Sequence, residues 1–284
     1  MNAQNDTRIL MCSPEHFHVD YVINPWMEGN VDNVSTELTQ AQWRRLRDTI
    51  ARFATVEEVT PAPGLPDMVF TANAGTVCGK RAVLSRFFHP ERQGEAAHFA
   101  RWFREHGFDV LELPEGMHYE GAGDSLIDRA GEWIWAGYGF RTDIESHRLV
   151  ADWLDREVVS LRLASPYFYH LDTCMCPLAG GYLIYHPGAF DDASRAEIER
   201  RVPAHKRIAV SEEDAENFAC NTVNIGRHVI MNRASDALRA RLRQSGFELH
   251  EVDLSEFLKS GGSAKCLTLK VTEPERVAEE QATA

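Results

Sequence analysis

The feature that most constrains the fold of this chain is a polar tip that recurs about every fifty residues. Each tip is a short run of small and polar residues beside an apolar segment, as in "TANAGTV" and "GAGDSLI". The key residues of the tips, of which the first is the loosest match, are Asn24, Asn73, Asp124, Asp172, Asn221 and Cys266. The intervals between them are 49, 51, 48, 49 and 45 residues. A period of this length indicates an internally repeated architecture.

Each repeat contains one helix and about three strands. Helical periodicity predicts five helices, at residues 39–53, 91–107, 141–157, 191–202 and 235–246. A short strand-like segment follows each helix, as in "VVSLRL", and further strands such as "YLIYH" follow the turns after the tips. We therefore predict an α/β ring of five units whose first and last segments meet. The alternative is an ordinary α/β fold in which similar loops recur by chance.

A closed ring would bring the tips to one central axis and gather distant residues in a single pocket. A thiol and a histidine are the minimum for covalent attack by sulfur, because one attacks and the other protonates the leaving group. Buried carboxylates need positive partners, and their two oxygens match the planar fork of a guanidinium. The tips therefore predict nucleophilic attack on a guanidino or amidino carbon. The candidate residues are Asn73, Glu120, Asp124, His170, Asp172, Asn221 and Cys266.

Cys266 is singled out by its place at the edge of an apolar run, after two glycines and Lys265. Backbone amides and a cation at this position would favour the thiolate. The alternatives are an inert thiol here and a buried core histidine at His170. Glu120 and Asp124 could likewise serve only the turn amides of "EGAGD". Three other cysteines are predicted to lie in the core or beside the site: Cys174, Cys176 and Cys220.

Composition limits the partners of the chain. A net charge of −13 offers little to nucleic acid or to an anionic membrane, and no apolar run is long enough to span one. Six cysteines without compact spacing, and no signal peptide, indicate a reducing cytoplasm. The C-x-C of "HLDTCMC" is not a usual zinc pair, so we expect no metal. We expect one catalytic domain over residues 1–284, with a core of about 8–272 and a polar C-terminal tail.

Four segments carry a family resemblance over about residues 10–271: "DMVFTANAG", "EGAGD", "HLDT" and "GGSAKCLT". They resemble the guanidino-group-modifying (amidinotransferase-like) superfamily. It includes arginine deiminases, dimethylarginine dimethylaminohydrolases, amidinotransferases and arginine dihydrolases. The resemblance implies a five-bladed, pentein-like propeller of ββαβ repeats. It also implies a hydrolase of free L-arginine that needs no cofactor.

The resemblance further implies roles at the tips. Cys266 is implied as the nucleophile and His170 as the general acid and base. Glu120 would orient the histidine or bind guanidinium, and Asp172 would be a second guanidinium anchor. Asp124 is kept as a candidate for the same pocket.

Outside the tips, the resemblance implies substrate contacts in two loops. Arg92 corresponds to a carboxylate-binding arginine on a mobile loop, and Arg141 resembles another substrate-contacting position. The alternative for both is a solvated surface arginine. Asn24 and Asn221 are candidates for further hydrogen bonds. A small guanidine is the expected partner, and a homo-oligomer is possible.

Position 73 departs from the deiminases, which hold a guanidinium-binding aspartate where this chain has Asn73. With "YVINPWMEGN" and "GGSAKCLTLKV", this asparagine makes the chain most similar to the arginine dihydrolases, which take arginine to ornithine, ammonia and carbon dioxide. In larger relatives this module is fused to a further domain, which we do not see here. The alternatives are a dimethylarginine dimethylaminohydrolase, an arginine deiminase, and a non-catalytic arginine-binding protein.

Overall fold

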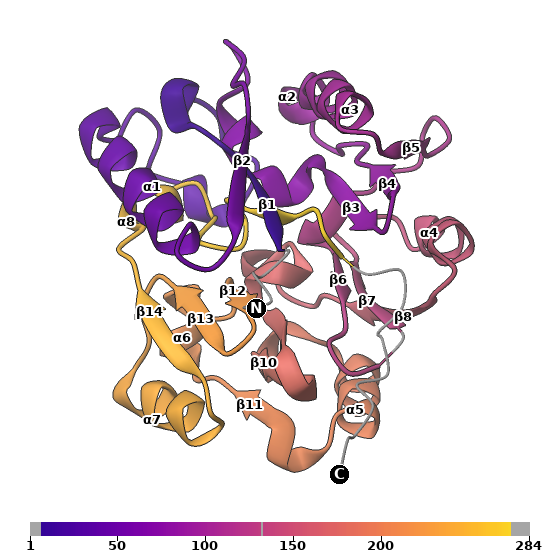
Figure 1. Ribbon diagram of the computed structural model, residues 1–284, viewed down its shortest axis with the longest axis vertical. Helices are drawn as coiled ribbons and strands as arrows, with labels where there is room; N and C mark the ends of the chain where they lie inside the picture. Colours follow the sequence, from indigo (N-terminus) through magenta and orange to yellow (C-terminus); the bar gives the residue numbers. More distant parts are fainter. Residues whose placement is uncertain (1–6, 132, 274–284) are drawn as a thin grey trace, which may run out of the picture.

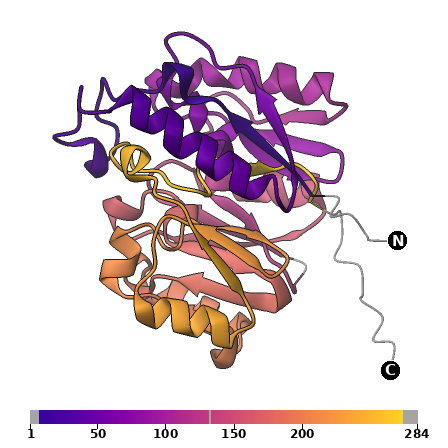
Figure 2. The same cartoon turned by 60° about the vertical axis from the view of Figure 1, so that its left-hand side comes forward.

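Five three-stranded sheets form a ring in the structure, a computed structural model that describes residues 7–131 and 133–273 (Figures 1 and 2). We number the blades by their strands: blade 1 is β15-β1-β2, blade 2 is β3-β4-β5, blade 3 is β6-β7-β8, blade 4 is β9-β10-β11 and blade 5 is β12-β13-β14. In every blade the first two strands are antiparallel and the last two are parallel. Parallel neighbours need a long crossover, and here a helix supplies it. The predicted ββαβ propeller is confirmed.

The strands are short. Their bounds are β1 Arg8–Cys12, β2 Thr55–Val59, β3 Gly75–Cys78, β4 Arg81–Leu84, β5 Asp109–Glu112, β6 Ser125–Ile127, β7 Trp133–Tyr138, β8 Glu157–Arg162, β9 Met175–Leu178, β10 Tyr182–Tyr185, β11 Arg207–Ala209, β12 Val223–Ile225, β13 His228–Met231, β14 Glu248–Glu251 and β15 Leu269–Lys270.

The helices lie on the outside of the ring (Figure 1). Their bounds are α1 Thr36–Ile50, α2 Pro90–Gln93, α3 Glu95–Glu105, α4 Ser146–Leu154, α5 Asp192–Arg201, α6 Glu212–Glu216, α7 Asp236–Gln244 and α8 Ser255–Leu258. In α1, Trp43, Leu46 and Ile50 are buried at helical spacing, so the helix covers its blade with one apolar face.

The five predicted crossover helices are present, with two differences. The helix expected at 91–107 is divided at Gly94 into α2 and α3. The helix expected from 141 begins only at Ser146, because the side chains of Arg141 and Thr142 point into the polar network at the tips. Both differences fall where the chain passes the pocket.

The two ends of the described chain close the ring. β1 pairs with β2 in parallel and with β15 in antiparallel fashion. The amide of Val271 donates to the carbonyl of Arg8 at 2.9 Å. Blade 1 therefore contains strands from both ends, as the repeat predicts. The predicted tail lies outside the described residues from 274 onward.

The structure corrects the place of Asn24 in the repeat. Each true tip precedes the first strand of a blade, so the five tips are Asn73, Asp124, Asp172, Asn221 and Cys266. Asn24 instead follows β1, in a loop between a second strand and its helix. Its interval of 49 residues from Asn73 is a coincidence of loop lengths, because blade 1 takes its tip from the C-terminal end of the chain.

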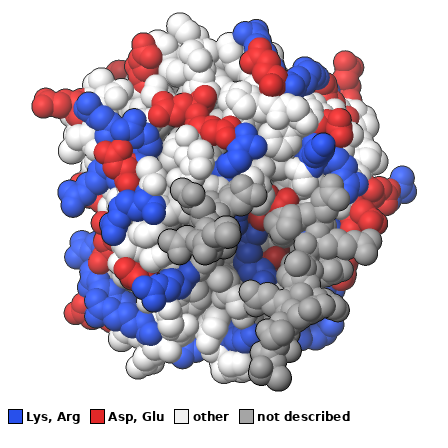
Figure 3. Space-filling model, in the orientation of Figure 1, with Lys and Arg blue, Asp and Glu red and all other residues white. Residues whose placement is uncertain are grey.

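The core lies within and between the blades. Cys174, Cys176 and Cys220 are buried in its largest apolar cluster, as predicted. Within residues 7–131 and 133–273, no helix is long and apolar enough to cross a membrane. On the face seen in Figure 3, Lys and Arg lie among Asp and Glu.

Candidate active site

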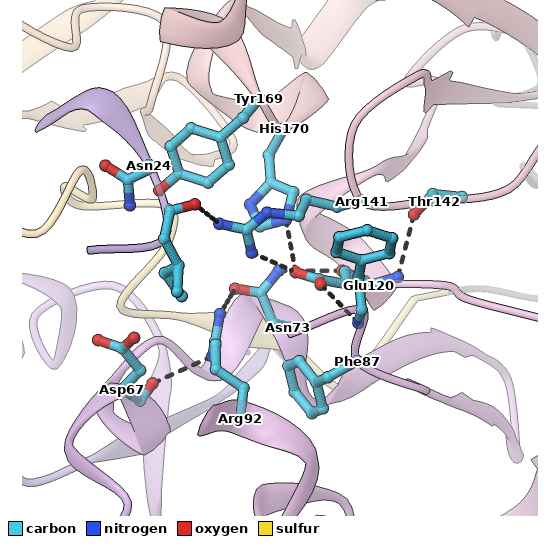
Figure 4. Close-up of polar contacts among 12 residues, drawn as sticks. Asn24, Asp67, Asn73, Phe87, Arg92, Glu120, Arg141, Thr142, Tyr169 and His170 are labelled. Atoms are coloured by element: carbon cyan, nitrogen blue, oxygen red, sulfur yellow. Dashed lines mark hydrogen bonds and ion pairs between the residues drawn. The ribbon is translucent and has the colours of Figure 1, made fainter. Parts of the chain in front are cut away.

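A narrow pocket on the axis of the ring is lined by two of the tips, Asn73 and Cys266, and by residues of neighbouring loops. Figure 4 shows the polar contacts around Asn73. All ten predicted site residues are buried. Six of them line the pocket: Asn24, Asn73, Arg92, Arg141, His170 and Cys266. The other four, Glu120, Asp124, Asp172 and Asn221, hydrogen-bond to these or to the adjacent tips. The alternative that Arg92 and Arg141 are solvated surface arginines is therefore wrong.

Two kinds of connection supply the pocket. The segments that lead from a third strand to the next blade carry Asp67, Glu120 and His170 just ahead of their tips. The loops between a second strand and its helix carry Asn24, Arg92 and Arg141. The repeat thus brings equivalent segments of different blades to one place.

His170 and Glu120 form a buried acid–base pair. Nε2 of His170 lies 2.7 Å from Oε2 of Glu120. Burial favours a neutral carboxyl, but Arg141 and His170 outweigh it and lower the pKa of Glu120. Burial lowers the pKa of His170 to about 4, although Glu120 opposes the change. A neutral imidazole that donates from Nε2 to an ionised carboxylate keeps Nδ1 for proton transfer.

Cys266 lies beside a carboxylate and an amide. Its Sγ is 3.5 Å and 3.6 Å from the two oxygens of Asp172 and 3.0 Å from Nδ2 of Asn221. Burial and Asp172 raise the pKa of the thiol, while the Ser263 backbone and Lys265 lower it only in part. The local backbone and the cation favour the thiolate, as expected, but burial and the neighbouring carboxyl group outweigh them.

Asp172 is itself affected by this environment. Burial raises the pKa of its carboxyl group to about 6, although Lys265 and the bonds from Cys266 and Asn221 act against the change. A buried carboxylate without a close cationic partner is costly. The arrangement therefore favours a cation placed between this carboxylate and the thiol.

Asn73 bridges two blades. Its Nδ2 donates to the carbonyl of Glu120 at 3.0 Å, and its Oδ1 accepts from Nη1 of Arg92 at 2.9 Å. Its hydrogen bonds therefore reach beyond its own turn. The absence of a side chain at Gly123 lets the Asn73 amide lie against this backbone, because a Cβ there would be 2.3 Å from Nδ2 of Asn73. The amide keeps one N–H and one oxygen lone pair for a ligand.

The two arginines are held differently. Arg92 is fixed by a bidentate pair with Glu95, at 2.8 and 2.9 Å, and by the carbonyl of Asp67 at 3.1 Å. Arg141 donates to Oε2 of Glu120 at 3.2 Å and to the carbonyl of Ile23 at 2.8 Å. Figure 4 shows the Arg141 guanidinium beside His170 and Glu120.

Asp124 and Asn221 join neighbouring tips. Asp124 accepts from Thr142 Oγ1 at 2.6 Å and from the amide of Leu171 at 3.0 Å. Asn221 donates to the carbonyl of Asp172 at 3.0 Å and accepts from the amide of Cys266 at 3.0 Å. Asp124 is therefore braced against the next blade and does not line the pocket, and the donors that hold it lie outside the turn "EGAGD".

Asp67 is a site residue that sequence reasoning missed. Its carboxyl group lines the pocket and accepts from Tyr21 at 2.8 Å and from Ser260 at 3.3 Å. Burial raises its pKa, although Arg92 opposes the change. The residue opens the quoted segment "DMVFTANAG", but it occupies no repeat position, so the period could not identify it.

A five-bladed ring of ββαβ repeats with cysteine, histidine and carboxylates at its axis defines the pentein, or amidinotransferase-like, class. Comparisons of the chain with known proteins identify its family within this class. A family model described as "N,N dimethylarginine dimethylhydrolase, eukaryotic" matches residues 41–273. The chain belongs to this family, within the guanidino-group-modifying superfamily.

Two curated relatives and one solved structure illustrate the similarity. The chain is 59% identical, over 95% of its length, to the bifunctional arginine dihydrolase/ornithine cyclodeaminase ArgZ of Synechocystis, and spans 38% of that protein. It is 42% identical to the N(G),N(G)-dimethylarginine dimethylaminohydrolase of Mycobacterium tuberculosis, over 93% of this chain and 85% of that one. The N-terminal domain of ArgZ, as a cysteine-to-serine mutant bound to substrate, superposes with a TM-score of 0.95 at 59% identity, over 95% of this chain and 100% of that one.

Proposed function

We propose that this chain is a cofactor-independent hydrolase of the guanidino group of free L-arginine, and that it gives ornithine, ammonia and carbon dioxide. The observation that carries the proposal is the pocket itself, where a thiol and a histidine meet two buried carboxylates and an asparagine. The 59% identity to the arginine dihydrolase ArgZ supports it.

Arg141, one of the two arginines that line the pocket, shows how the pocket holds a guanidinium group. It donates to Glu120, and its central carbon lies 4.8 Å from the centroid of the Tyr169 ring. Carboxylate forks and aromatic faces are the features that bind a planar cation. In the proposal, substrate arginine enters, Arg141 releases Glu120, and its guanidinium turns to the α-carboxylate of the substrate.

The pocket also has groups for the other end of an amino acid. The buried carboxylate of Asp67 suits an α-ammonium group, which needs acceptors. Arg92, which Glu95 holds in place, lies beside it and suits an α-carboxylate. These opposite charges support a free amino acid as substrate.

The first half of the proposed reaction starts at Cys266. A guanidinium beside Asp172 would supply the positive charge that lowers the pKa of the thiol. The thiol proton passes to His170, and sulfur bonds to the guanidinium carbon. His170 returns the proton to the departing nitrogen, the C–N bond breaks and ammonia leaves. Water, deprotonated by His170, then displaces the sulfur and gives citrulline.

The second half repeats these steps on the ureido carbon. Cys266 attacks again, a second ammonia leaves, and a second water releases a carbamate that decays to ornithine and carbon dioxide. The atoms balance as arginine plus two waters to ornithine, two ammonia and one carbon dioxide. Asn73 supports this round, because its spare N–H can donate to the ureido oxygen while its oxygen accepts a ureido N–H.

A dimethylarginine dimethylaminohydrolase is the second candidate, favoured by the matching family model and by the 42% identical relative. That enzyme must accept methyl groups on one guanidinium nitrogen. The Asp172 carboxylate, buried beside Cys266, is better suited to an unsubstituted nitrogen that donates hydrogen bonds. We therefore place arginine first.

The proposal is tested by incubating the chain separately with arginine, citrulline and asymmetric dimethylarginine and counting ammonia per substrate consumed. We expect two ammonia and one ornithine per arginine. One ammonia with citrulline would indicate a deiminase, and dimethylamine from the methylated substrate would indicate the second candidate. Binding of arginine without turnover would favour a non-catalytic binding protein.

A single catalytic domain in the cytoplasm is part of the proposal. None of the six cysteines, all of which lie in the described part of the chain, forms a disulfide, and this supports a reducing compartment. The closure of blade 1 by β1 and β15 supports one domain over the described residues. The partner is a small guanidine.

A further inference from the structure

Two histidines and a glutamate meet on the outer strands of blade 5, away from the tips. β13 and β14 run in parallel with His228 opposite Glu248 and Ile230 opposite His250. Side chains two apart in a strand share a face, so His228, Glu248 and His250 lie on one face of the sheet. β14 is the outer strand of this blade.

The facing atoms of these side chains are close together. Nδ1 of His228 lies 3.2 Å from Nε2 of His250. Oε2 of Glu248 is 3.7 Å from the first nitrogen, and Oε1 of Glu248 is 4.0 Å from the second. Ligand atoms bound tetrahedrally to zinc at about 2.0–2.2 Å lie roughly 3.3–3.5 Å apart. The histidine nitrogens, at 3.2 Å, are about 0.1 Å closer than this spacing, and the exposed glutamate needs only a small rotation to match it.

An aromatic contact orients the two imidazoles. The ring of Phe53 stacks on His228 at 3.8 Å and packs obliquely on His250 at 5.0 Å. The nearby cations are Arg52, over Phe53, and Arg227, paired with Glu248.

We propose that His228, Glu248 and His250 form a binding site for a divalent transition-metal ion, zinc being the best match. Two imidazole nitrogens and one carboxylate are a usual zinc ligand set, and the fourth position would hold water. Oxygen-preferring ions such as Mg²⁺ are poor candidates. The ion would join β13 to the outer strand β14.

One neighbour competes with the ion. Nη2 of Arg227 donates to Oε2 of Glu248 at 2.8 Å, and this pair is exposed. Exposed ion pairs are worth about 0.2–1 kcal/mol. Arg227→Ala should therefore free the carboxylate and tighten zinc binding, by at most about fivefold.

The test is calorimetric titration of the metal-free full chain with ZnCl₂. The same titrations are repeated with the parent chain and each variant carrying the additional substitution Cys266→Ser, so that the pocket thiol adds no zinc site. We expect the parent chain to bind one equivalent of zinc. His228→Ala and His250→Ala each remove a ligand and should weaken zinc binding by at least roughly 10–100-fold, the loss usual when a residue that only supports a metal ligand is removed. Zinc should also raise the Tm of the parent chain, but not of these variants.

The matched control is His18→Ala, which removes an exposed histidine paired with Asp20 and should leave the zinc affinity unchanged. X-ray absorption should report two nitrogen ligands and one carboxylate. The proposal is overturned if the parent chain binds no zinc. It is also overturned if His228→Ala retains full affinity, or if His18→Ala reduces zinc binding as much as His228→Ala does.

Discussion

Asn73 and Asp124 occupy the same position in successive blades, yet their side chains have different surroundings. Asn73 lines the pocket and keeps hydrogen-bonding capacity, whereas Asp124 accepts from Thr142 and Leu171 with its two oxygens. Cys266 and Asn221 differ in the same way, since the cysteine lines the pocket and the asparagine supports its amide and sulfur. The repeat determines where a tip emerges, and the adjacent loops determine whether it meets a ligand or a neighbouring blade.

The largest expected effect is at the pocket-lining tip Cys266. Cys266→Ser should abolish arginine hydrolysis while the fold stays intact, because a hydroxyl is far less ionised than a thiol. Turnover by the folded variant, with circular dichroism as the fold check, would exclude this nucleophile. Peptide mapping with an electrophilic amidine should label Cys266 ahead of Cys174 and Cys220, which lie in the core.

The next largest effect is expected at His170, which precedes its tip. His170→Ala should lower kcat by at least about 10²–10⁴-fold, the usual worth of a placed proton-transfer group, because both half-reactions use it. Steady-state kinetics with ammonia detection measure the loss. A decrease of less than roughly tenfold would make His170 a core histidine.

The comparison between Asn73 and Asp124 is tested by a pair of variants. Asn73→Asp should still consume arginine but accumulate citrulline, because an aspartate would face the ureido oxygen with like polarity. The matched change at the braced tip, Asp124→Asn, should leave the ratio of ornithine to citrulline unaltered. Amino-acid analysis of the products decides. Unchanged ornithine output from Asn73→Asp would remove the proposed role of this amide.

The smallest effect concerns stability at Asp172. Its carboxyl pKa is raised in the folded state, from 3.8 to about 6, so ionisation destabilises the fold as pH rises through this window. Asp172→Asn should lower activity. At pH 8 its free energy of unfolding should exceed that of the parent chain by up to about 3 kcal/mol, which denaturant titration measures. The difference should decline as the pH falls and vanish below the unfolded-state pKa, at about pH 3. Equal stabilities at both pH values would show that burial does not strain this carboxyl group.

The sequence alone predicts the blades well, because every repeat has the same order of strand, strand, helix and strand. The period also places Asn73, Asp172 and Cys266 at the axis without any knowledge of contacts. It misleads at Asn24, where a loop of similar length imitates a tip although the true tip of blade 1 lies at the other end of the chain.

The electrostatics of the pocket could not be predicted in the same way. The pKa of Cys266 depends on burial and on the distance to Asp172, neither of which a motif contains. The pairing of Arg141 with Glu120 depends on the loop between β7 and α4, which is not a tip, and Asp67 lies between tip positions. These features are set by packing between blades.

The pairing of β1 with both β2 and β15 means that the ring has no natural starting point. Blade 1 is assembled from both ends of the described chain, so the four other blades each form an uninterrupted segment. A circularly permuted chain, with its original ends joined by a flexible linker and new ends in the Ala179–Gly181 turn between β9 and β10, would keep every strand pair of blade 1 in one covalent segment. The ring would then be closed by blade 4, where β9 and β10 would come from opposite ends of the permuted chain. The pocket would keep the same residues.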